Sequence, residues 1–197
     1  MGVVKEVCVD NIKDAINAFE KGADRIEFCS NLYEDGLTPS FDDLIYLKKN
    51  ISIPVRVMVR PHSNSFNYSH DDLIRMKETI EFCKNEKFDG VVFGCLYEND
   101  ELDLNKIMYL ADFAKPLNVI IHKAIDLTSS PINSLKKLLE IDNVNGILSS
   151  GGCNTADLGS EILKKMIHIS PNDFEIISAG KITDQNFETL HEKIDGK

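Results

Sequence analysis

Short apolar runs alternate with amphipathic stretches along the whole chain, and this alternation constrains the fold more than any other feature. Seven apolar runs occupy residues 3–9, 25–29, 54–60, 90–95, 118–122, 146–150 and 174–179. Several of them are hydrophobic almost without interruption, which is typical of parallel strands that helices cover. Between the runs, apolar residues recur at helical spacing, as in Ile12, Ala15, Ile16 and Phe19. The alternation therefore predicts repeated strand and helix units around a parallel sheet.

These repeated units favour a TIM-like (β/α) barrel over an open dinucleotide-binding sheet. The first strand is not followed by a Gly-x-Gly-x-x-Gly turn, and no linker or break in composition divides the sequence. We therefore expect one α/β barrel domain over residues 1–197. After the seventh run only a helix-like segment, residues 183–194, remains. The eighth strand is therefore expected to be missing or incomplete.

Polar residues mark the expected starts of the helices. The residues that stand where N-caps belong are Asp10, Ser40, Ser69, Ser130, Thr155 and Thr183. Pro131 suits a first helical position, and Gly22 suits a left-handed stop after the first helix.

Composition and charge argue against two classes of partner. The formal net charge of −10 repels a phosphate backbone, so nucleic acid is not an expected partner. No apolar run approaches the roughly 18 residues of a membrane span, and residues 1–6 lack the regions of a secretory signal. The five cysteines are odd in number and widely spaced, which favours reduced thiols. We therefore expect a cytoplasmic protein without membrane association.

Charged residues alternate with apolar residues in the second and third strands. Successive side chains point to opposite faces of a strand, so parity separates the barrel interior from the surface under the helices. The apolar set must face the helices, and the predicted interior set is then Glu6, Arg25, Glu27, Arg56 and Arg60. Ions buried without partners are costly, so these residues either pair in a structural network or line a wet pocket. Glu27 and Arg60 lie nearer the C-terminal mouth, where barrel enzymes place their sites.

The ends of the fifth and sixth strands carry further polar groups. His122, Lys123 and Asp126 follow one strand, and an imidazole beside a carboxylate can exchange protons or bind a metal. A histidine there can equally be a hydrogen-bonded core residue. Ser150 and Gly151 end the other strand, in a glycine turn that can expose backbone N–H groups to a phosphate or simply reverse the chain.

Cys8 and Cys29 share the interior parity in consecutive strands, which lie about 4.8 Å apart in a sheet. Two thiolates at that spacing can hold Cu(I), with Met58 or His122 as further candidates. A buried cysteine is also often an inert small hydrophobe, so this reasoning leaves the copper site open.

Read together, these strand ends resemble the CutC family. The resemblance rests on Glu6-Val7-Cys8, Gly22-Ala23-Asp24-Arg25-Ile26-Glu27-Phe28-Cys29, Gly36-Leu37-Thr38-Pro39-Ser40, Arg60-Pro61, His122-Lys123-Ala124-Ile125-Asp126 and Ser149-Ser150-Gly151-Gly152. It extends over about residues 4–185. The resemblance implies a TIM-like barrel, a cytoplasmic homodimer and a proposed role in copper homeostasis, with Cu(I) at Cys8 and Cys29. Lys123 departs from the family, which often has Arg there, and this weakens any bidentate contact with an anion.

Two functions follow as hypotheses. The first is Cu(I) binding by Cys8 and Cys29 in copper homeostasis. The alternative is an enzyme that acts on a small anionic substrate, such as a phosphorylated one, at the C-terminal mouth of the barrel. Its catalytic candidates are Glu27, Arg60, His122 and Asp126, and its substrate-binding candidates are Glu6, Arg25, Lys123, Ser150 and Gly151.

Overall fold

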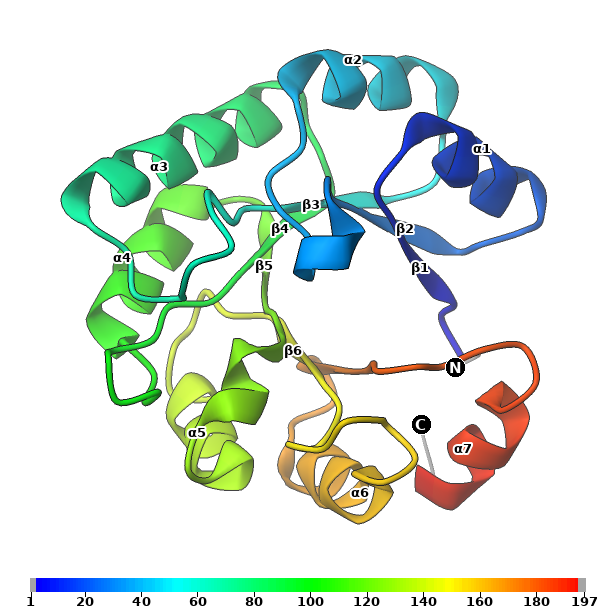
Figure 1. The fold of residues 1–197 in the computed structure, drawn as a ribbon, viewed down its shortest axis with the longest axis vertical. Coiled ribbons are helices and arrows are strands. Elements are labelled where there is room, and N and C mark those ends of the chain that lie inside the picture. The colour runs from blue at the N-terminus through cyan, green and yellow to red at the C-terminus, as the bar shows by residue number, and fades with distance from the viewer. Residues whose placement is uncertain (1–2, 195–197) are drawn as a thin grey trace. The chain divides into compact units, whose positions relative to one another are not determined.

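Strands and helices alternate through residues 3–194, which are the residues that the computed structural model describes (Figure 1). The strands are β1 (Glu6–Val9), β2 (Arg25–Phe28), β3 (Val55–Met58), β4 (Gly90–Phe93), β5 (Asn118–Ile121), β6 (Gly146–Ser149) and β7 (Glu175–Ser178). The α-helices are α1 (Ile12–Glu20), α2 (Phe41–Asn50), α3 (His70–Asn85), α4 (Leu104–Ala114), α5 (Pro131–Leu138), α6 (Ser160–Ile169) and α7 (Phe187–Ile194). Each strand lies inside one of the seven predicted runs, so the predicted alternation is confirmed.

All seven strands belong to one sheet, in the order β1-β2-β3-β4-β5-β6-β7. The pairings from β1 to β4 and from β5 to β7 are parallel, as the crossover helices require. This topology confirms the TIM-like α/β class. The described residues contain seven strands and no eighth, which also agrees with the expectation from the sequence.

The chain divides into two compact units. The N-terminal unit comprises residues 4–93 and 110–119, and the described part of the C-terminal unit comprises residue 3 and residues 94–109 and 120–194. In the N-terminal unit, helices α1, α2 and α3 lie along one side of strands β1 to β4 (Figure 1). Ile26, Phe28 and Val57 are buried between these layers together with Leu44 and Leu47 of α2. These members of the apolar parity set are therefore part of the buried core.

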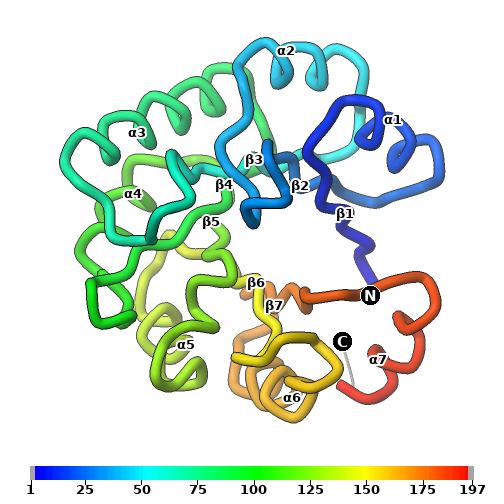
Figure 2. Tube along the Cα trace, viewed as in Figure 1, coloured from blue at the N-terminus to red at the C-terminus, as the bar shows by residue number. Residues whose placement is uncertain are grey.

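In the C-terminal unit, α5 and α6 cover β6 and β7. The apolar stripes of these helices are fully buried at Leu135, Leu138, Leu163 and Met166, and Ile147 of β6 is equally buried. The tube in Figure 2 follows the chain from β5 through a short helical turn into α5, beside the turn that leaves β6.

Three of the expected N-caps are confirmed. Ser40, Ser69 and Ser130 precede α2, α3 and α5, and each hydroxyl accepts a hydrogen bond from the backbone N–H three residues later. Pro131 is the first residue of α5, and Gly22 has a φ of +85° after α1.

The other three N-cap predictions are wrong in position. Helix α1 is capped by Asn11, because Asp10 accepts a hydrogen bond from the backbone N–H of Leu32 instead. Thr155 caps only a turn, through the N–H of Leu158, and α6 begins later. Likewise α7 begins after a turn that starts at Thr183.

Two short 3-10 helices follow strands and were not predicted. The first, η1 (Leu32–Glu34), follows β2, and the second, η2 (Lys123–Leu127), follows β5. The second contains two candidate site residues, Lys123 and Asp126. In the part of the chain that the structure describes, no helix is both long enough and apolar enough to cross a membrane.

Candidate functional site

Cys8 and Cys29, which we call the thiol pair, lie together in the N-terminal unit. Cys8 of β1 stands beside Glu27 in the register of β1 and β2, and its Sγ donates to Glu27 Oε1 over 3.4 Å. Cys29 lies close enough to Cys8 to influence the ionisation of its thiol. Cys29 is fully buried, with its Sγ 3.5 Å from the carbonyl oxygen of Val9, whereas Cys8 is exposed. The thiol pair therefore has one sulfur-bearing residue open to solvent and one sealed in the core.

The environment of Cys8 opposes ionisation of its thiol. The neighbouring Cys29 thiol, the partial burial of the sulfur and the nearby Glu6 carboxylate all raise the pKa of Cys8 well above its ordinary value. Each of the two thiols would have to lose its proton before it could bind a metal ion as a thiolate.

Glu27 is a carboxyl group in an unusual setting. Its residue is only 3 % exposed, and burial, the Cys8 thiol and the Glu6 carboxylate raise the pKa of Glu27 well above its ordinary value. The Oε2 of Glu27 and the Oε1 of Glu6 are both buried without a donor among the described residues. A proton held on Glu27 would satisfy this arrangement, because it turns one of two facing acceptors into a donor.

Beside the thiol pair runs a row of ions, Glu6, Arg25, Arg56 and Asp89, which we call the ion row. Arg25 Nε bonds to Glu6 Oε2, and Arg56 Nη1 lies 3.5 Å from the same oxygen. Arg56 Nε lies 3.1 Å from Asp89 Oδ2, and the Arg56 side chain is 1 % exposed. Glu6, Arg25 and Arg56 are therefore paired within one face of the sheet, as parity predicted. Asp89 was missed, because it precedes β4 and no residue pattern links it to Arg56.

Arg60 is buried but bonds to backbone carbonyls rather than to the ion row. Its Nη1 donates to the carbonyl oxygens of Glu34, at 2.6 Å, and Gly36, at 3.1 Å, and its Nη2 donates to that of Ser63 at 3.5 Å. The guanidinium also lies over the ring of Phe66, 4.7 Å from its centroid. Arg60 thus anchors the loop that follows η1.

That loop packs directly against the thiol pair at Gly36. This residue has a φ of +81°, and a Cβ added to it would lie 3.3 Å from Cys29 Sγ and 3.6 Å from Met58 Cε. A side chain here would be strained by its backbone and crowded by the sulfur. Gly36 was part of the sequence motif, but only the tertiary structure reveals that it closes over Cys29.

His122 belongs to the C-terminal unit, where it caps η2. Its ring is 4 % exposed, and its Nδ1 accepts a hydrogen bond of 3.2 Å from the backbone N–H of Ala124. A Cβ added to Gly94 would lie 2.8 Å from the imidazole ring, so this glycine makes room for the ring. Because Nδ1 accepts a hydrogen bond, a neutral His122 ring carries its proton on Nε2. Lys123 follows as the first residue of η2 and is half-buried.

Asp126 holds the turn after β6, and we call this arrangement the Asp126 turn. Its carboxylate accepts hydrogen bonds from Ser149 Oγ at 2.5 Å, from Ser150 N and Oγ at 2.8 and 2.9 Å, and from Gly152 N at 2.8 Å. The N–H of Gly151 donates to Ser149 Oγ. The backbone donors that a phosphate could have used are therefore bonded to a carboxylate and a hydroxyl of the chain itself.

The structure thus brings the predicted site residues into two groups. Glu6, Cys8, Arg25, Glu27 and Cys29 are together in the N-terminal unit, and Asp126, Ser150 and Gly151 are together in the C-terminal unit. Within the described residues, no three His, Cys, Asp or Glu side chains form a metal-binding group. Two thiols remain a suitable donor set for Cu(I), which accepts low coordination by soft sulfur.

The remaining cysteines lie apart from the thiol pair. Cys83 is buried in α3, and burial raises its pKa to about 12. Cys95 is also buried, while Cys153 is partly exposed beyond β6.

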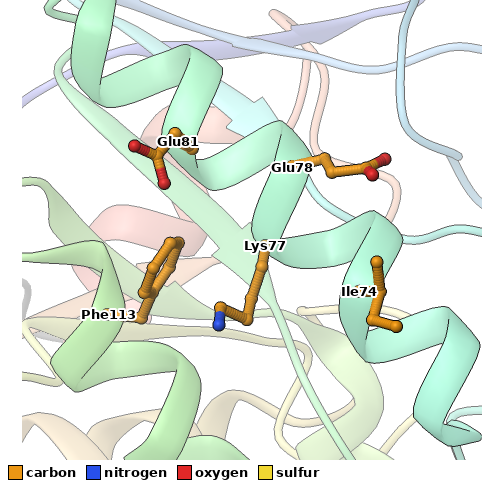
Figure 3. Close-up of a pocket in the computed structure, with 5 residues that line it drawn as sticks. All are labelled: Ile74, Lys77, Glu78, Glu81 and Phe113. Atoms are coloured by element: carbon orange, nitrogen blue, oxygen red, sulfur yellow. The ribbon is translucent and has the colours of Figure 1, made fainter.

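A surface hollow of about 430 Å³ lies between α3 and α4 (Figure 3). It is lined by Ile74, Lys77, Glu78, Glu81 and Phe113, and the Lys77 ammonium lies 4.5 Å from the centre of the Phe113 ring. None of the predicted site residues lines this hollow, so it adds nothing to the candidate site.

Comparisons with known proteins connect these features to a family. The sequence model described as the CutC family matches residues 3–195. A "Copper homeostasis protein cutC homolog" of Homo sapiens is 38 % identical over 191 residues, covering 97 % of this chain and 70 % of that protein. A "family protein CutC" of Aliivibrio fischeri is 35 % identical over 195 residues, covering 98 % of this chain and 78 % of that protein.

Solved structures agree. The crystal structure of the CutC protein of Streptococcus agalactiae matches with a TM-score of 0.90 at 26 % identity, over 100 % of this chain and 96 % of that one. N-acetylneuraminate lyase of Mycoplasma synoviae matches with a TM-score of 0.63 at 16 % identity, over 98 % and 66 % of the two chains, which shows the shared barrel-type fold alone. The family model matches nearly the whole sequence, and the human and bacterial relatives are 38 % and 35 % identical to it. This chain therefore belongs to the CutC family.

Proposed function

We propose that this protein binds Cu(I) through Cys8 and Cys29 and serves copper homeostasis. The observation that carries the proposal is the position of the two thiols at the ends of neighbouring strands, where Cys29 is near enough to raise the pKa of Cys8. Cu(I) prefers soft sulfur ligands, and two thiolates suffice for it. The names of the human and bacterial relatives support the same role.

The surrounding residues support a site that holds its sulfurs in place. The Cys8 thiol donates a hydrogen bond to Glu27, which helps to fix the position of the sulfur. Arg60 holds the backbone of Gly36, which packs against Cys29. The exposed Cys8 offers a path from solvent, and the buried Cys29 supplies the second sulfur.

The proposal is tested by competition against a Cu(I) chelator under reducing conditions. We expect Cys8→Ser and Cys29→Ser each to lower Cu(I) affinity by roughly 100-fold or more, because a hydroxyl is a poor ligand for a soft ion. Cys83→Ser is the matched control, since it removes a buried thiol of α3 that lies outside the thiol pair.

Equal copper retention by the wild type and the Cys8→Ser, Cys29→Ser double variant would reject the site. A melting temperature recorded for each variant separates loss of ligand from loss of fold.

A second proposal is an enzyme for a small anionic substrate, favoured by Glu27. A buried carboxyl with a raised pKa is typical of catalytic acids and bases. Under this proposal the N-terminal unit holds the catalytic candidates Glu27 and Arg60 and the substrate-binding candidates Glu6 and Arg25. The candidates in the C-terminal unit are His122 and Asp126 for catalysis and Lys123, Ser150 and Gly151 for substrate binding. A panel of small phosphates and carboxylates, tested for a rise in melting temperature, should then give a hit that Glu27→Gln reduces. If none of the compounds raises the melting temperature, the enzyme proposal is rejected and the copper proposal remains.

We also propose that the chain is one domain, located in the cytoplasm and assembled as a homodimer. A single family model covers residues of both compact units, which supports one domain. The odd number of widely spaced cysteines supports a reducing compartment. Light scattering on the purified protein should give about twice the mass of 22.1 kDa, and the monomer mass would reject the dimer.

A further inference from the structure

Met58 lies on the same face of the sheet as the thiol pair. It ends β3, is 5 % exposed and has the same strand parity as Arg56 of the ion row. The register pairs Glu27 with Arg56 and Phe28 with Val57. Continued by one residue, this register sets Cys29 beside Met58, on neighbouring strands and on one face.

Gly36 provides an independent measure of how the two side chains lie. The point where a Cβ of Gly36 would stand is 3.3 Å from Cys29 Sγ and 3.6 Å from Met58 Cε. The buried thiol and the end of the thioether side chain therefore border one point beneath the loop that Arg60 anchors.

We propose that Met58 supplies its thioether as a third sulfur ligand to the Cu(I) ion held by Cys8 and Cys29. This inference rests on the proposed copper function and extends it. The thioether is a soft and neutral donor, so it favours Cu(I) without adding a proton that must leave. It would also distinguish Cu(I) from Zn²⁺, which thioethers bind poorly.

The alternative third ligand, His122, has less support. Its Nδ1 is already the acceptor for the Ala124 N–H. Methionine also fills irregular gaps in protein cores. The experiment must therefore separate ligation from packing.

The first measurement is the Cu(I) affinity of Met58→Leu, by the same chelator competition. Leucine keeps the volume and apolar character but removes the sulfur. We expect affinity to fall about tenfold or more, with the melting temperature of the metal-free protein nearly unchanged. Met76→Leu is the matched control, because Met76 is a buried methionine of α3 in the same compact unit.

The second measurement detects the ligand directly, and its first arm uses the wild-type protein. X-ray absorption at the copper edge of selenomethionine-labelled wild-type protein should show a selenium neighbour of Cu(I). The Met76→Leu protein should keep this selenium signal, and the Met58→Leu protein should lose it.

The outcomes separate the two proposals. Copper bound with sulfur neighbours but without selenium, together with unchanged affinity in Met58→Leu, overturns the role of Met58 and leaves the thiol pair in place. Failure of the wild type to bind Cu(I), or binding that survives loss of both cysteines, overturns the proposed function itself and this inference with it.

Discussion

Glu27 and its neighbours show how one buried residue can set the chemistry around it. Glu27 accepts from Cys8, faces Glu6 and stands beside the ion row, yet one of its oxygens lacks a donor among the described residues. Burial disfavours the charged carboxylate, so the pKa of Glu27 is raised. The folded protein therefore binds a proton here that the unfolded chain releases above its ordinary carboxyl pKa.

The pH dependence of stability should reveal this proton. Because the folded-state pKa of Glu27 is raised, its contribution to stability is present at low pH and declines as pH rises toward the folded pKa. Glu27→Gln removes this titration while keeping the shape. We expect the stability of the variant relative to wild type to increase between pH 5 and pH 8, by at most about 1.4 kcal/mol per pH unit. Denaturant unfolding of the two metal-free proteins at several pH values measures this change in relative stability. If the difference in unfolding free energy between them does not vary with pH, Glu27 is ionised in the folded state.

At the scale of elements, short strands depend on side chains that fix the turns after them. The strands of this chain are four residues long, and their functional residues stand at or just beyond their ends. Arg60 bonds the loop after η1, and Asp126 bonds the turn after β6. These contacts replace the backbone pairing that longer strands would provide.

Removing the Asp126 carboxylate should loosen the Asp126 turn. Asp126→Ala leaves the N–H groups of Ser150 and Gly152 without their acceptor, and we expect a loss of about 2 kcal/mol in unfolding free energy. Hydrogen exchange should accelerate at these two amides more than in β6 itself. Asp142→Ala is the control, because Asp142 is an exposed residue of the same unit. Equal exchange in both variants would mean that the turn is held by its backbone alone.

At the scale of the whole molecule, charge is the dominant property. The formal net charge is −10, although the row of ions at β1 to β3 is internally paired, with Arg25 and Arg56 set against Glu6 and Asp89. The excess negative charge must therefore lie on other residues, mostly in solvent. Such a molecule repels polyanions and leaves small cations as favoured partners.

Nucleic acid should accordingly fail to bind. We expect no change in the anisotropy of a fluorescent DNA duplex of about 20 base pairs with up to micromolar protein at physiological ionic strength. A basic DNA-binding protein serves as the positive control. Saturable binding that weakens with added salt would contradict the prediction and point to a local basic surface.

The sequence by itself determined the fold class. The periodicity of its apolar residues predicted seven strands at the positions where the structure has them. Strand parity also assigned Arg56 and Ile26 to opposite faces of the sheet. These are local patterns, and backbone geometry converts them directly into faces. The sequence could not provide Asp89 as a partner of Arg56, the Gly36 loop over Cys29, or the four hydrogen bonds that occupy Asp126. Those depend on residues between 7 and 33 positions apart meeting across strand ends, where the path of each loop decides which groups pair. Only the tertiary structure fixes those paths, because the loops are held by contacts with distant strands and not by their own periodicity.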